Sequence, residues 1–167
     1  YILSQKKAYK IISKYRSKNV KSYNAILYNA ESNLRDRNFL IKKICIYIKN
    51  NVYKKKKIPV GNLKLIRDFG WAPELVEGIY YMSYLKPCDM IISSGKSYLL
   101  ENMIKFIFEI KKLNYKNFIT IDKNLFRKNE QLTVASDMKS TIKRLKIYNW
   151  KPKIYGKKLV KKIYNGL

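Results

Sequence analysis

The chain has 167 residues, 47% of them hydrophobic, which is enough apolar material for one domain or a large piece of one. Its formal net charge is +26, and it contains two cysteines and no histidine. A zinc site of the usual Cys/His kind is therefore nearly excluded. Cys45 and Cys88 are too widely spaced in the sequence for a disulfide framework, so we expect buried free thiols.

The beginning of the chain predicts no export signal. No charged stretch followed by an apolar run and a small-residue site opens it. The longest apolar stretch, residues 39–52, is interrupted by lysines and falls short of the roughly 20 apolar residues of a membrane helix. The first residue is Tyr1 rather than Met, which we interpret as a trimmed start or a fragment. We expect a cytoplasmic protein with no membrane partner.

Two explanations compete for the positive charge. Only six of the cations are arginines, and the chain is rich in Lys, Ile, Asn and Tyr, whose codons are all A/T-rich. A skewed base composition would therefore produce this pattern without a basic partner. Nucleic-acid grooves favour arginine for paired contacts, so we consider nucleic acid the less favoured partner. That rival hypothesis predicts lysines clustered with exposed tyrosines on one face.

Hydrophobic spacing predicts strands alternating with helices along the chain. We expect helices over residues 1–18, 38–52, 72–85, 98–108, 138–147 and 157–165, and strands over 23–28, 58–60, 89–93 and 117–122. Residues 29–33 are predicted to form a polar turn. Ser97 is the expected N-cap of the fourth helix, and Ser136 or Asp137 that of the fifth.

This alternation predicts an α/β fold. A dinucleotide-binding fold would carry G-x-G-x-x-G between a first strand and helix. None of the six glycines forms such a triplet. We infer that the chain alone cannot make the usual pyrophosphate cradle.

Four segments carry candidate chemistry, although each is weak by itself. They are I-L-Y-N-A-E-S at 26–32, G-N-L-K-L-I-R-D-F-G-W-A-P at 61–73, L-F-R at 125–127, and residues 137–152, which end in N-W-K-P. Taken singly, Arg67 beside Asp68 is compatible with a salt-bridged turn. The S-G-K-S at 94–97 is not a P-loop, because the upstream glycine is absent.

In this order and at these spacings, the segments resemble those of GDP-mannose 4,6-dehydratases. These are extended short-chain dehydrogenase/reductase proteins of the NAD-dependent epimerase/dehydratase family. The 61–73 segment is similar to the family's G-N-L/M-x-x-x-R-D-W-G, and 26–32 is similar to I-L-F-N-H-E-S. Residues 125–127 resemble F-F-R-P, and residues 137–152 resemble D-x-x-K…L-G-W-K-P. The resemblance covers the whole chain but only the second half of the family's length.

The resemblance implies the α/β fold of the C-terminal part of an extended short-chain dehydrogenase. Residues 1–32 would be a remnant of the NAD(P)-binding Rossmann domain, carrying the tyrosine helix and the strand after it. Residues 33–167 would form a small α/β portion that binds the nucleotide sugar.

The resemblance also implies a lyase that converts GDP-mannose to GDP-4-keto-6-deoxymannose with tightly held NADP, kept mainly by the missing N-terminal half. Tyr1 matches the catalytic tyrosine of a Tyr-x-x-x-Lys pair. The lysine position is occupied by Gln5, which supplies no positive charge, and Lys6 comes one residue late, about 100° further round a helix. We expect the chain to be inactive alone.

The remaining implied sites belong to the cofactor and the substrate. Gln5, Ala30 and Arg35 match cofactor positions, and the family has a histidine where this chain has Ala30. The positions that match substrate contacts are Asn29, Lys43, Arg67, Arg127 and Glu130. Guanidinium groups suit phosphate oxygens through paired, charge-assisted hydrogen bonds. We therefore predict that Arg67, Arg127 and Lys43 converge on one pocket.

Three alternatives stay open at this stage. The chain could belong to another nucleotide-sugar epimerase or dehydratase, to the basic nucleic-acid-binding module described above, or to a remnant that binds nothing useful. The resemblance also implies a possible homo-oligomer.

Overall fold

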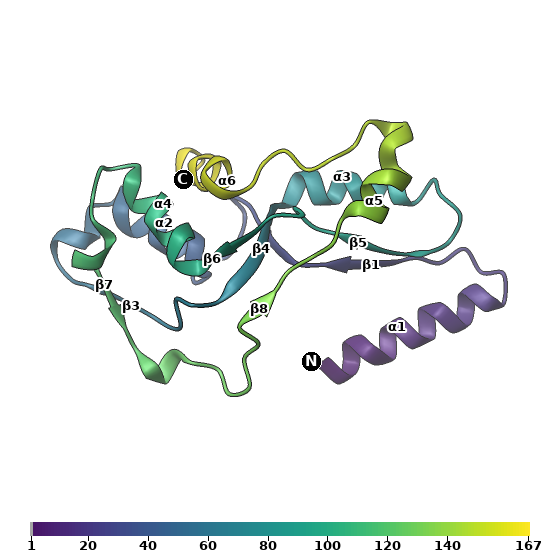
Figure 1. The fold of residues 1–167 in the computed structure, drawn as a ribbon, viewed down its shortest axis with the longest axis horizontal. Coiled ribbons are helices and arrows are strands. Elements are labelled where there is room, and N and C mark those ends of the chain that lie inside the picture. Colours follow the sequence, from purple (N-terminus) through teal and green to yellow (C-terminus); the bar gives the residue numbers. More distant parts are fainter. Residues whose placement is uncertain (1) are drawn as a thin grey trace.

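The computed structural model describes residues 2–167, so the predicted catalytic Tyr1 lies outside the described residues. The molecule is elongated, with one group of helices at each end and strands between them (Figure 1). The helices are α1 (Ile2–Ser17), α2 (Leu40–Lys49), α3 (Ala72–Met82), α4 (Leu100–Glu109), α5 (Lys139–Leu145) and α6 (Gly156–Asn165). The strands are β1 (Asn24–Leu27), β2 (Asn29–Glu31), β3 (Ile58–Val60), β4 (Ile66–Trp71), β5 (Asp89–Ile92), β6 (Ser97–Leu99), β7 (Ile119–Ile121) and β8 (Thr133–Val134).

Most strand pairs are parallel. β1 pairs with β5, β3 with β7, and β2 and β8 with β4, whereas β6 runs antiparallel to β4. Parallel neighbours need a crossover connection, which is usually a helix. The predicted α/β class is therefore confirmed.

One end of the molecule is a closed core between α2, α4 and α6, which we call the three-helix core. Nineteen buried hydrophobic residues form it. The apolar face predicted for α4 is buried there, and Phe108 stacks on Phe118 with ring centroids 5.7 Å apart. Burial of this kind stabilises the fold by about 25 cal/mol for each Å² of apolar surface removed from water.

The other end has a smaller core, made by α3, α5, β1 and β5, which we call the edge core. Seven buried hydrophobic residues form it, and Ala25 and Ala30 pack against it. Trp150 of the N-W-K-P segment lies on Gly78, where an added Cβ would meet the indole at 2.5 Å. Its indole N–H donates to the Glu74 carbonyl at 3.0 Å. The segment therefore anchors the chain to α3. The proposed domain boundary after residue 32 stays a prediction.

Some predicted elements were wrong. Residues 29–31 form β2 rather than a turn, because the parallel strand β4 satisfies their backbone. That strand itself was not predicted. Ser97 lies in β6, and α4 begins after Leu99 without a side-chain cap. The N-cap of α5 is Met138 rather than Ser136 or Asp137, although the Asp137 carboxylate accepts the Lys139 N–H at 2.9 Å.

The structure also bears on the membrane helices, metal sites and cysteines considered in the sequence. Within residues 2–167, no helix is both long and apolar enough to cross a membrane, and no cluster of His, Cys, Asp and Glu could hold a metal ion. Both cysteines are free; Cys45 is buried, as predicted, whereas Cys88 is only half-buried. Burial raises the pKa of the Cys45 thiol to about 12, so this thiol is inert at neutral pH.

Candidate functional site

Between the two ends, a hollow of about 490 Å³ opens beside β2, β4 and the start of α2. Residues from distant parts of the sequence line it, and among them are five predicted site residues: Asn29, Arg35, Arg67, Arg127 and Glu130. We call this hollow the arginine pocket.

Arg67 is positioned on β4 and fastens the loop that carries Glu130. Its guanidinium donates to the carbonyls of Ile66 (2.8 Å), Leu132 (3.0 Å) and Gln131 (2.8 Å). It also lies 3.4 Å from a Glu130 carboxylate oxygen. These four contacts use four of the five N–H donors of a guanidinium. Arg67 therefore shapes the pocket wall and keeps one donor for a ligand.

Arg127 is the more available cation of the pocket. It is exposed, and among residues 2–167 its guanidinium has no hydrogen bond or ion pair. Its loop can approach β3 because residue 61 is glycine, where an added Cβ would lie 3.1 Å from the Leu125 carbonyl oxygen. The Gly61-Asn62 pair of the motif thus makes room for the Leu125–Arg127 segment.

Arg35 lies shortly before α2 and is held by residues close to it in the sequence. Its guanidinium donates to the Ala30 carbonyl, lies 3.5 Å from a Glu31 oxygen and stacks 3.7 Å from the centre of the Phe39 ring. The side chain is 25% exposed. Arg35 is therefore preorganised, with one flank facing the pocket.

Glu31 lies at the pocket wall and was not assigned a role from the sequence. Its residue is 3% exposed, and its Oε2 atom has no hydrogen-bond partner. Burial raises the pKa of its carboxyl from 4.5 to about 7, although the Arg35 guanidinium acts in the opposite direction. The only sequence signal was its place in the I-L-Y-N-A-E-S segment.

Asn29 is fixed by a buried polar network around Asp68. Its amide donates to the Asp68 carbonyl at 2.9 Å. The Asp68 carboxylate accepts from the Ser94 backbone N–H (3.0 Å) and the Ser136 hydroxyl (2.6 Å). Asp68 is therefore not the ion partner of Arg67 in a turn, because it ties β4 to the segments after β5 and before α5.

Two other predicted site residues lie elsewhere. Lys43 follows Phe39 by one turn of α2 and lines a separate hollow of about 330 Å³ with Tyr47 and Pro59. Gln5 lines a groove between α1 and β1. The predicted convergence of Arg67, Arg127 and Lys43 therefore holds for the two arginines, and Lys43 does not line the arginine pocket.

The described residues do not by themselves fit a nicotinamide dinucleotide. Arg35 is bound to Ala30 and Glu31 and faces the arginine pocket, whereas Gln5 lines a different groove. A pyrophosphate would need a glycine-rich turn at a helix start. The glycines with positive φ, Gly95 and Gly156, do not supply that arrangement.

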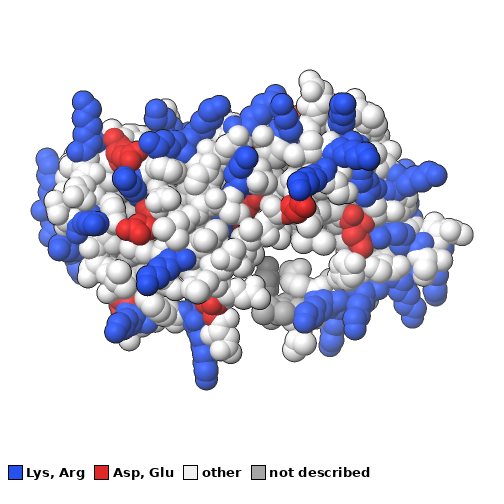
Figure 2. Space-filling view, viewed as in Figure 1, with Lys and Arg blue, Asp and Glu red and all other residues white. Residues whose placement is uncertain are grey.

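On the face seen in Figure 2, the positive charge is not gathered in one place. Lys and Arg side chains are scattered over the whole face seen in Figure 2, with a few acidic residues among them. A nucleic-acid groove would instead concentrate them in a stripe or patch. The arginine pocket stands out by its residue type, because it combines three of the six arginines.

Comparison with solved structures indicates the class of protein to which this fold belongs. The chain matches the fold of RMD from Pseudomonas aeruginosa complexed with NADPH, with a TM-score of 0.75 and 15% identity over 93% of this chain and 50% of that one. It also matches a dTDP-glucose 4,6-dehydratase from Bacillus anthracis in complex with NAD, with a TM-score of 0.78 and 12% identity over 93% of this chain and 47% of that one. The fold is thus that of the NAD-dependent epimerase/dehydratase proteins.

Sequence comparison narrows the class to one family. The family model described as GDP-mannose 4,6 dehydratase matches residues 1–163. GDP-mannose 4,6 dehydratase 1 of Arabidopsis thaliana is 33% identical over 140 residues, which are 83% of this chain and 38% of that protein. The human GDP-mannose 4,6 dehydratase is 27% identical over 179 residues, covering 95% of this chain and 47% of that protein. The chain belongs to the GDP-mannose 4,6-dehydratase family and spans less than half the length of these two relatives.

Proposed function

We propose that this chain forms the nucleotide-sugar-binding portion of a GDP-mannose 4,6-dehydratase-type lyase, in which the arginine pocket holds the GDP-sugar. The observation that carries the proposal is the meeting of five predicted site residues around one hollow. They come from three separate stretches of sequence: Asn29 and Arg35, Arg67, and Arg127 and Glu130. Family membership adds the substrate class, because the relatives are GDP-mannose 4,6 dehydratases.

Each residue has a separate task in this proposal. Arg127, which has no protein partner among the described residues, binds a phosphate oxygen of the diphosphate. Arg67 uses its remaining donor for the same group and keeps the 130–132 loop in place. Asn29, oriented by Asp68, offers its amide oxygen to a sugar hydroxyl. Glu130, 20% exposed beside Arg67, lies where it can accept from the nucleotide.

The proposal assigns no chemical step to the described residues. The family's nicotinamide cofactor, NADP in the proposed intact enzyme, would supply the redox chemistry, but residues 2–167 do not hold it. Tyr1 keeps its proposed catalytic role and Gln5, Ala30 and Arg35 their proposed places beside the cofactor, whereas Lys43, which lines a separate hollow, has no task in the arginine pocket. The purified chain should therefore bind nucleotide without turning it over, and a cytoplasmic location remains part of the proposal.

The test is isothermal titration of the 167-residue chain with GDP-mannose, UDP-glucose and dTDP-glucose. We expect GDP-mannose to bind tightest. A preference for uridine or thymidine sugars would replace the proposal by another nucleotide-sugar epimerase or dehydratase. Absence of binding by all three would reject the proposed function, and measurable turnover of GDP-mannose would reject the claim that the chain is inactive alone.

A further inference from the structure

Glu31 lies at the wall of the arginine pocket, and the proposed function gives it no task. It is the last residue of β2, and only 3% of it is exposed. No described residue donates a hydrogen bond to its Oε2 atom. The Nε atom of Arg35 lies 3.5 Å from Oε1 and makes no hydrogen bond either. Buried carboxylates are normally hydrogen-bonded, so the protein does little to stabilise the charged form of Glu31.

Charged and ionisable groups approach Glu31 from several elements. The Arg35 guanidinium acts most directly, and Cys45 of α2 lies close enough for Glu31 to contribute to its raised pKa. Trp71 of β4 is the register partner of Glu31, and the Nζ atom of Lys162 on α6 lies 5.3 Å from the centre of the Trp71 ring. Arg35 is thus the cation that holds the Glu31 carboxylate in its charged form, against the effect of burial.

The acidic residues of the elements that pack against β2 have better partners. The Asp68 carboxylate of β4 accepts from a backbone N–H and a hydroxyl, and the Glu74 carboxylate of α3 accepts from two backbone N–H groups. Burial raises the pKa of the Glu31 carboxyl to about 7. The chain contains no histidine, the side chain that ordinarily titrates near neutral pH. Glu31 therefore takes the place of a histidine as a group that can gain a proton near pH 7.

The charges of the arginine pocket favour this gain when an anion binds. Three arginines and two carboxyls, those of Glu31 and Glu130, line the hollow. The surplus of one cation matches only one of the negative charges that a sugar diphosphate carries on its two phosphates. A like charge nearby disfavours the ionised form of a carboxyl, and more so where water is excluded. An anionic ligand beside Glu31 therefore favours its neutral form.

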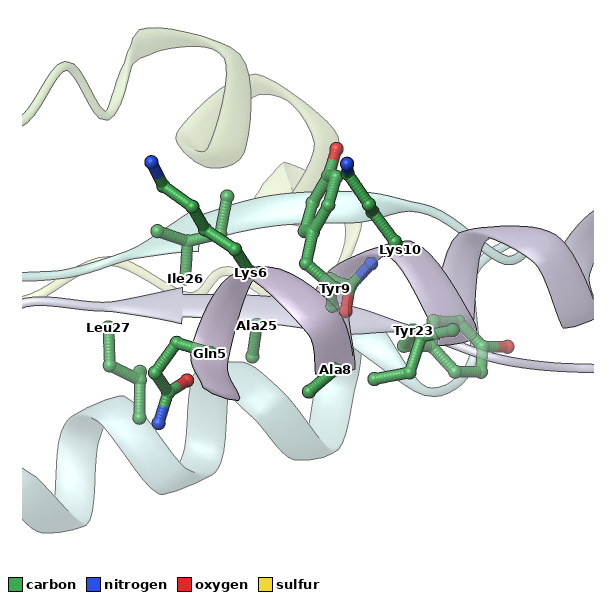
Figure 3. A pocket seen from close by; sticks show the side chains of 11 residues that line it. Gln5, Lys6, Ala8, Tyr9, Lys10, Tyr23, Ala25, Ile26 and Leu27 are labelled. Carbon is green, nitrogen blue, oxygen red and sulfur yellow. The ribbon is translucent and has the colours of Figure 1, made fainter. Parts of the chain in front are cut away.

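The groove between α1 and β1 has a different chemistry. It is larger, at about 600 Å³, but neither a carboxyl nor an arginine is among the described residues that line it. Its ionisable side chains are the lysines and tyrosines seen in Figure 3, namely Lys6, Tyr9, Lys10 and Tyr23. The combination of arginines with a buried carboxyl distinguishes the arginine pocket from this groove.

We propose that Glu31 is the proton acceptor of the arginine pocket: its carboxylate takes up one proton from the solvent when an anionic nucleotide binds, and it stays neutral while the pocket is occupied. The proton removes the negative charge that would repel the phosphates. It also frees Arg35 from its ion pair, so that the guanidinium turns its remaining donors to the ligand. This inference rests on the proposed nucleotide-binding function of the same pocket.

The test is isothermal titration of the 167-residue chain with GDP-mannose at pH 7.5 in PIPES, HEPES and Tris, whose ionisation enthalpies differ. The slope of the observed binding enthalpy against the buffer ionisation enthalpy gives the number of protons exchanged. We expect an uptake of about half a proton per bound nucleotide, because Glu31 is partly protonated before the ligand binds. Binding should also be about tenfold weaker at pH 8.5 than at pH 6.

Two variants assign the proton to its residue. Glu31→Gln keeps the shape of the neutral carboxyl, so it should bind without proton uptake and about tenfold more tightly than the wild type at pH 8.5. Its affinity should change little between pH 6 and pH 8.5. The matched control is Glu77→Gln, at an exposed position of α3 outside the pocket, which should keep the proton uptake and the pH profile of the wild type.

Three results would overturn the inference, and they differ in what they leave standing. Proton uptake that persists in Glu31→Gln would assign the proton to another group. Equal wild-type affinities at pH 6 and pH 8.5, with no uptake, would show that Glu31 does not respond to the ligand. Both results leave the proposed function intact. Absence of GDP-mannose binding at either pH would reject the proposed function together with this inference.

Discussion

The two ends of this molecule differ in the size of the hydrophobic core that each one buries. Within residues 2–167, the three-helix core buries nineteen hydrophobic residues and the edge core buries seven, and strand β1 of the edge core pairs with β5 alone. The arginine pocket lies against the complete end, since Ile41 and Leu100 of the three-helix core line it. Gln5, which we propose lies beside the cofactor, lines the groove at the other end.

We infer from this difference that the proposed nucleotide binding depends mainly on the pocket side of the fold. The elements that shape the pocket are all supplied by this chain, so we expect ligand binding to survive in isolation. Among the described residues, β1 pairs with β5 alone, and Gln5 lies in the groove beside it. The predictions that follow test this division.

The largest predicted effect is the difference between the losses of unfolding free energy caused by one mutation at each end. Phe108→Ala removes a fully buried ring from the three-helix core and should lower the unfolding free energy by about 3–5 kcal/mol. Leu27→Ala, at a 47% exposed position of β1, should cost below about 1 kcal/mol. Urea unfolding measures both. Similar losses would show that the two ends are equally well packed, and the comparison would fail.

Glu31 should make the pocket side of the molecule sensitive to pH. Its folded pKa, about 7, lies above the ordinary 4.5. Its contribution to stability is therefore fully present below pH 4.5 and is lost as the pH rises through 7. A shift of this size corresponds to about 3 kcal/mol. Urea unfolding of the wild type and of Glu31→Gln, at pH 4.5 and pH 8, should show a difference between them that changes by about this amount.

The control for that measurement is Glu77→Gln, which changes an exposed carboxyl on α3. Its difference from the wild type should stay nearly constant between the two pH values. If Glu31→Gln behaves in the same way, the Glu31 carboxyl titrates normally and is not buried at the pocket wall.

A smaller effect should appear at the contacts that Arg16 and Tyr9 of α1 make with Asp89 of β5. Hydrogen bonding from Arg16 holds the pKa of the Asp89 carboxyl at about 2, below the ordinary 3.8, so its stabilisation is present above pH 3.8 and is lost as the pH falls through 2. The carboxylate is partly exposed, so Asp89→Asn should cost about 1–2 kcal/mol. Amide exchange should accelerate in α1 and stay unchanged in α4. Equal acceleration in both helices would mean that α1 is not separately attached.

The sequence predicted the helices better than the strands for a physical reason. The face of α4 repeats at helical spacing, so Leu100, Met103 and Ile107 indicate both the helix and its buried side. In contrast, β2 consists of the polar Asn29 and Glu31 around one alanine, and it becomes a strand only through its distant partner β4. A three-residue strand leaves too short a pattern to be recognised before its partner is known.

The residues of the candidate site were likewise predicted only in part. The family motifs located Arg67 and Arg127, and both line the pocket. The hydrogen bonds from Arg67 to the Gln131 and Leu132 carbonyls depend on tertiary structure that no spacing encodes. Glu31 was overlooked because a single carboxylate in a polar segment gives no sign of being buried. Lys43, which the resemblance matched to a substrate contact, lines another hollow with Tyr47 and Pro59.

The central claim is that the arginine pocket binds a GDP-sugar through this chain alone. Its most direct test is titration of GDP-mannose into the wild type, Arg127→Ala and Lys128→Ala, because the two variants remove the same charge from adjacent exposed positions of one loop and only Arg127 lines the pocket. We predict about tenfold weaker binding for Arg127→Ala, as expected for one charge-assisted contact, and nearly unchanged binding for Lys128→Ala. Equal affinities for the two variants would contradict the account, because the ligand would then respond to the general positive charge and not to the pocket.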